Sequence, residues 1–103
     1  AYKLPKETEE EKAIRRQAIA DAGVVGASVP LENAKLCRRV YDIGIELVGK
    51  TNSNCYTDLT IGCELAKIGT NGCVMNICVN LSLVKDEAKL QEFNDAMKEL
   101  RID

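Results

Sequence analysis

The chain has 103 residues, a formal net charge of −2 and a pI near 5.2; 46% of its residues are hydrophobic and 29% are charged. This size and composition are typical of one small globular domain. Basic residues are scattered among acidic ones, which argues against a nucleic-acid-binding or membrane-binding surface, and the charged N-terminal segment without an apolar run predicts a cytoplasmic protein.

The first predicted helix covers about residues 9–25. Thr8 is followed by three glutamates, and this pattern is a capping box that starts a helix. The stretch Gly23–Gly26 and then Pro30 predict a break or kink, because glycine weakens a helix and proline removes a backbone donor. Apolar residues then recur every three or four positions, which predicts a second helix over residues 30–48.

A turn, TNSN at 51–54, precedes a third helix that begins near Cys55–Asp58 and continues into the apolar run VMNICVNLSLV at 74–84. Because glycine costs a helix about 1 kcal/mol relative to alanine, Gly62 and Gly69 indicate that another backbone or a ligand packs against this face. One stripe of the third helix repeats at intervals of three and four: Asp58, Gly62, Ala66, Gly69, Cys73, Asn76 and Asn80.

A fourth helix, over residues 86–100, carries an apolar seam beneath a charged outer face. The fold class predicted is therefore all-α, an up-and-down helical bundle. The third helix is apolar on more than one side, so we expect a partial bundle that is completed by dimerisation or by a missing N-terminal half.

The sequence has five cysteines, no CxxC pair and no histidine. Zinc sites need clustered thiolates or imidazoles at short spacing, so we predict reduced thiols that act as small hydrophobes and no metal site. Catalysis by Ser-His-Asp or Cys-His within this chain is also excluded. Any acid or base must be Asp, Glu, Lys, Tyr or water.

Four segments of the chain form a recognisable set: LPKETEEEKAIR at 4–15, VPLENA at 29–34, TNSNCYTDLTIGCELA at 51–66 and NGCVMNICVNLSLVKD at 71–86. In this order and spacing they resemble the second half of the formiminotetrahydrofolate cyclodeaminase / methenyltetrahydrofolate cyclohydrolase family. One position departs from the family pattern, since Thr51 stands where Gly is usual before Asn52.

Members of this family are about twice as long, so the resemblance identifies residues 1–103 as the C-terminal half of a cyclodeaminase/cyclohydrolase-like helical domain. The chain could be a fragment, one subunit of a split enzyme or a shortened homologue. The resemblance implies a dimer that binds a tetrahydrofolate derivative as its substrate in a cleft near the subunit interface, without a metal. The partner could also be a separate chain that carries the missing half.

The resemblance implies one of two reactions. In the first, 5-formiminotetrahydrofolate cyclises to 5,10-methenyltetrahydrofolate and releases ammonia; in the second, the methenyl bridge is hydrolysed to give 10-formyltetrahydrofolate. We expect an enzyme of one of these two kinds, although this chain alone could be inactive. The alternative is a non-catalytic helical assembly or binding module derived from the family.

Asp58 is the predicted catalytic residue, with Asn54 and Thr57 beside it as substrate-binding residues. At a helix N-terminus a carboxylate stays ionised, which suits an anion or a base that stabilises the methenyl cation. The structural alternative is that Asp58 only complements the helix dipole. Lys6, within the LPK segment, is the predicted contact for the anionic glutamate tail of folate, although most such lysines are solvated.

Asn76 and Asn80 lie in the most apolar stretch of the chain, where an amide without a partner is costly. Either they are buried amides that fix helix register, or they line the folate cleft opposite Asp58. On one helix Asp58 and Asn80 would lie about 33 Å apart, too far to touch one folate head group.

Overall fold

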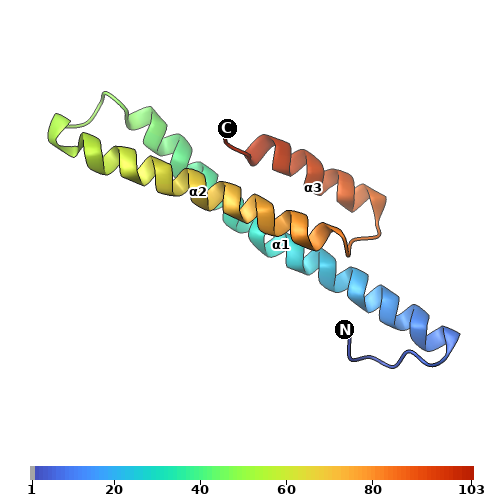
Figure 1. The fold of residues 1–103 in the computed structure, drawn as a ribbon. Coiled ribbons are helices and arrows are strands. Elements are labelled where there is room, and N and C mark those ends of the chain that lie inside the picture. The colour runs from blue at the N-terminus through green and yellow to red at the C-terminus, as the bar shows by residue number, and fades with distance from the viewer. Residues whose placement is uncertain (1) are drawn as a thin grey trace.

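The computed structural model describes residues 2–103 and contains three α-helices and a short 3-10 turn. Helix α1 covers Glu9–Leu47, the turn η1 covers Ser53–Cys55, α2 covers Tyr56–Leu81 and α3 covers Glu87–Leu100. No strand occurs within residues 2–103, so the all-α prediction is confirmed. The helices run up, down and up in an elongated molecule of 67 × 24 × 16 Å (Figure 1).

Helix α1 is continuous for 39 residues, so the two helices predicted over residues 9–25 and 30–48 are one, and the prediction of a break between them is wrong. Proline inside a helix costs about 3 kcal/mol or more, so something must offset that cost. Small residues on both sides of Pro30 pack against α2: Ala20, Gly23, Ala27 and Ala34 are buried. We infer that this burial holds the helix together across the proline.

The α1–α2 contact depends on small residues that bring the two backbones close together. A Cβ added at Gly44 would lie 2.6 Å from Cys63 Sγ on α2, so the thiol would have to rotate away. One added at Gly23 would lie 2.6 Å from Leu83 Cβ and 3.1 Å from the Leu83 backbone, so Gly23 is required where the chain leaves α2 and passes close to α1.

The predicted contact of Gly69 is confirmed, because an added Cβ there would lie 3.2 Å from Cys37 Sγ on α1. At Gly62 nothing within residues 2–103 lies within 4 Å of an added Cβ, so a contact there with a ligand or another chain stays a prediction. The later part of the stripe, from Gly69 to Asn80, faces α1.

The caps of α1 and α3 follow the sequence closely. Thr8 and Glu11 form the predicted capping box, in which Thr8 Oγ1 accepts from the Glu11 amide at 3.0 Å. Asp86 caps α3 by accepting from the amides of Ala88 and Lys89. The N-terminal ends of α1 and α3 were therefore predictable from local chemistry.

Helix α3 covers one end of the α1–α2 pair and completes the core there, with Ala27, Ile77 and Phe93 at its centre and Met97 partly buried beside them. The C-terminal end of α3 is held by Arg38, whose guanidinium donates to the carbonyls of Glu99, Leu100 and Arg101. None of the helices described is both long and apolar enough to cross a membrane.

Candidate functional site

A groove of about 330 Å³ between α1 and α2 is the best candidate for a binding site. Helix α1 contributes VPLENA residues, and α2 contributes residues of the apolar run more than 40 positions later in the sequence. The helices run antiparallel, and this direction brings the two segments together (Figure 1). The residues that line the groove are Gly26, Val29, Pro30, Asn33, Cys73, Asn76 and Asn80.

Asn80 has a mainly structural role in this groove. Its Nδ2 donates to the main-chain carbonyl of Asn76, one turn earlier, at 3.0 Å. Its side-chain oxygen lies against Gly26, so closely that a Cβ at Gly26 would overlap it. Asn80 therefore fixes how α1 and α2 fit together, as the structural interpretation of this residue predicted.

Asn76 and Asn33 differ from Asn80 because both are exposed. Within residues 2–103 no hydrogen bond occupies either of their side-chain amides. The structural interpretation predicted that Asn76 and Asn80 are both buried amides. For Asn76 this prediction is wrong. Sequence reasoning did not single out Asn33, although it lies inside the VPLENA segment, because its partner across the groove is set only by the tertiary fold.

Pro30 adds a further polar feature to the groove. In an α-helix the carbonyl of residue i accepts from the N–H of residue i+4, but Pro30 has no N–H to give to the Gly26 carbonyl. Both residues line the groove. The groove therefore combines two open side-chain amides with a backbone carbonyl that lacks its usual helix partner.

The thiol of Cys73 is the titratable group in the groove. Burial raises its pKa, and the neighbouring Cys37 thiol raises it further. A raised pKa keeps Cys73 protonated at neutral pH, so it is not an activated nucleophile. The chemistry that the groove residues themselves can supply is hydrogen bonding and orientation.

The structure does not bring the other predicted site residues to this groove. Asp58, Thr57 and Asn54 are all exposed at the η1 end of the molecule, where Asp58 lies in the first turn of α2. Asp58 lies 18 residues before Asn76 on the same helix, a separation of about 27 Å. Within one chain, Asp58 and the asparagines cannot contact the same small group.

Lys6 lies at the opposite end of the molecule from Asp58. It lines a hollow of about 280 Å³ at the start of α1, together with Lys12, Arg15 and Arg16. The segment before α1 folds back along the first turns of the helix, since the Arg15 guanidinium lies 5.4 Å from the centre of the Tyr2 ring (Figure 1). Lys6 therefore belongs to a cluster of four cations.

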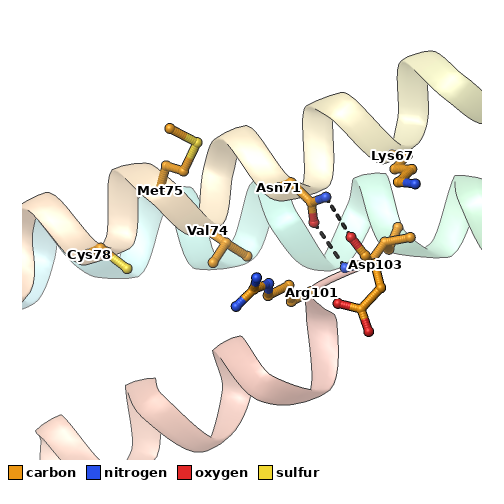
Figure 2. Close-up of a pocket in the computed structure, with 8 residues that line it drawn as sticks. Lys67, Asn71, Val74, Met75, Cys78, Arg101 and Asp103 are labelled. Atoms are coloured by element: carbon orange, nitrogen blue, oxygen red, sulfur yellow. Dashed lines mark hydrogen bonds between the residues drawn. The ribbon is translucent and has the colours of Figure 1, made fainter.

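A hollow of about 530 Å³ lies between α2 and the C-terminal residues (Figure 2). Asn71 spans its edge with two hydrogen bonds: its Nδ2 donates to the Ile102 carbonyl at 2.7 Å, and its Oδ1 accepts from the Ile102 amide at 2.9 Å. Both amide functions of Asn71 are thus used to hold the C-terminal segment. We interpret this region as a structural contact.

Residues 2–103 contain no group of three or more His, Cys, Asp or Glu side chains placed to hold a metal ion. The fold and the groove thus define an all-α protein with an uncharged, hydrogen-bonding groove between two long helices. The family model described as "Formiminotransferase-cyclodeaminase" matches residues 1–99. The chain belongs to this family.

Curated relatives carry two kinds of name. A methenyltetrahydrofolate cyclohydrolase of Methylorubrum extorquens is 35% identical over 92 residues, which are 89% of this chain and 44% of that protein. The formimidoyltransferase-cyclodeaminase of Sus scrofa is 32% identical over 88 residues, or 85% of this chain and 16% of that protein. The chain therefore spans less than half the length of these relatives.

Proposed function

We propose that this chain forms part of an enzyme of folate one-carbon metabolism that acts on the bridge between N5 and N10 of tetrahydrofolate. One observation carries the proposal: the two segments VPLENA and VMNICVNLSLV, which resemble the cyclodeaminase/cyclohydrolase family, meet in one groove. The names of the relatives, cyclohydrolase and cyclodeaminase, support the same chemistry.

The groove fits the pterin end of such a substrate. A pterin ring presents amino and ring N–H donors next to carbonyl and ring-nitrogen acceptors on one edge. The amides of Asn33 and Asn76 can donate and accept, and the Gly26 carbonyl can accept. Held in this way, the reacting nitrogens and the one-carbon unit keep a fixed geometry, which is a large part of what ring closure needs.

In the cyclodeaminase reaction, N10 attacks the formimino carbon and gives up its proton. The former imine nitrogen takes up this proton and a second one and leaves as ammonia, and the 5,10-methenyltetrahydrofolate cation forms. In the cyclohydrolase reaction, water adds to the methenyl carbon, a proton is released and the N5–carbon bond breaks to give 10-formyltetrahydrofolate. Both reactions need a proton donor or acceptor that the two amides cannot supply. Asp58 is our candidate for this proton donor or acceptor. A second chain would contribute it, because Asp58 cannot reach the groove of its own chain.

The exposed outer face of α2 supports association with a second copy or with a chain that carries the other half of the family domain. Ile61, Leu65, Ile68, Met75 and Val79 recur at helical spacing and are 53–73% exposed. A soluble monomer rarely leaves such a continuous apolar stripe in water. Light scattering at micromolar concentration should show a dimer or larger species; a well-folded monomer would contradict this.

The test of the function is binding and turnover with matched variants. We expect 5-formyltetrahydrofolate to bind the chain and the double variant Asn33→Ala/Asn76→Ala to weaken that binding about tenfold or more, since each hydrogen bond contributes about 1 kcal/mol. Asn94→Ala, an exposed asparagine on α3, is the control. Assays with 5-formimino- and 5,10-methenyltetrahydrofolate would separate the two reactions.

A second candidate is a non-catalytic helical assembly module, which the exposed apolar stripe of α2 also favours. The two candidates differ in their response to folate. A folded chain that associates with a copy of itself or with a chain carrying the other half of the domain, and in that assembly turns over neither substrate and shows no thermal shift with 5-formyltetrahydrofolate, would establish the module and overturn the enzyme.

A further inference from the structure

Two cysteines lie at the contact between α1 and α2, next to the asparagine groove. Cys37 is on α1, Cys73 is on α2, and both are half-buried. A Cβ added at Gly69, one turn before Cys73, would lie 3.2 Å from Cys37 Sγ and 3.8 Å from Cys37 Cβ. Cβ atoms joined by a disulfide are about 3.5–4.5 Å apart, so at this level the two helix backbones are close enough for such a bond.

The antiparallel register of the helices turns the two cysteine side chains toward each other (Figure 1). Gly26 on α1 contacts Asn80 on α2. Eleven residues later on α1, Cys37 contacts Gly69, which is eleven residues earlier on α2. Because each Cα–Cβ bond tilts toward the N-terminus of its own helix, Cys37 leans from the level of Gly69 toward Cys73, and Cys73 leans back toward Cys37.

The environment of the Cys73 thiol agrees with this placement. Burial raises the pKa of Cys73, and the nearby Cys37 thiol raises it further, as a thiol in close contact would. Cys73 also lines the groove, which gives a small reagent a path to the pair from solvent.

The other three cysteines lie elsewhere in the fold. Cys63 contacts α1 at the level of Gly44 and is ten residues, or about 15 Å, from Cys73 along α2. Cys55 is exposed in η1, and the exposed Cys78 contacts the Met97 sulfur on α3 at 3.5 Å. Cys37 and Cys73 are therefore the two thiols that the α1–α2 register itself brings together.

We propose that Cys37 and Cys73 are a redox-sensitive pair, in which a small-molecule disulfide such as oxidised glutathione joins the two sulfurs and ties α1 to α2 beside the asparagine groove. The thiolate of one cysteine attacks a glutathione sulfur, the glutathione S–S bond breaks, and one glutathione leaves. The second cysteine gives up its proton, attacks the sulfur of the first cysteine and expels the second glutathione. Two protein thiols are oxidised to one disulfide, and the small disulfide is reduced to two thiols that take up the two protons.

The bond has consequences for stability and for the groove. It joins positions 36 residues apart and so restricts the unfolded chain more than the folded one. Cys37 follows Asn33 by one turn, and Cys73 precedes Asn76 by about one turn, so the bond also fixes the separation of the groove walls. Because its raised pKa keeps Cys73 protonated at neutral pH, exchange is slow, and the pair responds to sustained rather than brief oxidation.

The experiment incubates the 103-residue chain with oxidised glutathione, blocks the remaining thiols with iodoacetamide in denaturant, and maps the disulfides by proteolysis and mass spectrometry. We expect peptides joined through Cys37 and Cys73, and a melting temperature higher than that of the reduced chain by about 5 °C or more, both reversed by dithiothreitol. Cys73→Ser should abolish the bond and the rise. Cys63→Ser, which changes another half-buried thiol of α2 at the α1 contact, is the matched control and should keep both.

An oxidised chain in which Cys37 and Cys73 are both alkylated, or each carry a separate glutathione, would overturn the inference. So would an equal rise in melting temperature in Cys73→Ser. The peptide map is made on the unmodified chain, so it decides the question even if a variant does not fold. None of these outcomes depends on folate binding, so a failure here leaves the proposed function standing.

Discussion

The α1–α2 pair has two differently packed ends. The end that α3 covers contains the two largest fully buried side chains, Ile77 and Thr70, as well as the Phe93 contact. At the other end, the structure describes every residue from 35 to 65, and none of them is fully buried. Two helices alone cannot enclose a core, so within residues 2–103 the core is confined to the end that α3 covers.

The largest expected effect tests this comparison directly. Ile77→Ala should lower the free energy of unfolding by about 2–5 kcal/mol, because it leaves a cavity in the covered core. Ile61→Ala, at the open end where the side chain is 53% exposed, should cost less than about 1 kcal/mol in a monomer. Urea denaturation measures both, and a loss at Ile61 as large as that at Ile77 would show that the open end is buried in an assembly.

Gly69 and Gly62 offer a second comparison on a single helix. Gly69→Leu should cost about 1–3 kcal/mol, because the new side chain would collide with Cys37. Gly62→Leu should be neutral or stabilise the chain by up to about 1 kcal/mol, because leucine is the better helix former and the space is open. The melting temperatures of the two variants report the difference; a loss at Gly62 would place a second chain against it.

The smallest effect concerns Cys73 and pH. The folded chain raises the pKa of this thiol above its ordinary 9.0, chiefly by burial, so the folded state holds the proton more tightly than the unfolded state. The resulting stability is fully present below the unfolded pKa and is lost as pH rises through the folded pKa. Between about pH 8 and about pH 10.5, the chain should therefore lose more stability than Cys73→Ala does.

Urea denaturation midpoints of the unmodified chain and of Cys73→Ala, each measured at both pH values, test this prediction. Subtracting the change seen in Cys73→Ala from the change seen in the unmodified chain removes the titration of tyrosines and lysines that both proteins share. A parallel decline of the two proteins would show that the Cys73 thiol has the same pKa in the folded and unfolded states.

Local chemistry made much of the fold predictable. The capping box at Thr8 and the amphipathic seam of α3 each depend on residues a few positions apart, and both were predicted from the sequence. The cap at Asp86 is equally local, although the sequence analysis predicted only a helix over residues 86–100. The family was also evident from four short segments, and the match over residues 1–99 confirms it. The prediction of Asp58 as a catalytic residue stays a prediction.

Only the tertiary structure decided the features that depend on contacts between helices. Pro30 lies inside one long helix because the burial of small residues against α2 outweighs the tendency of proline to break a helix. No local sequence pattern contains the free energy of that burial. Asn33 and Asn76 line one groove for the same reason, since the antiparallel register of α1 and α2 sets which distant residues meet. The sequence by itself determined the all-α fold class, the capping box at Thr8 and the family, whereas packing determined the length of α1 and the composition of the groove.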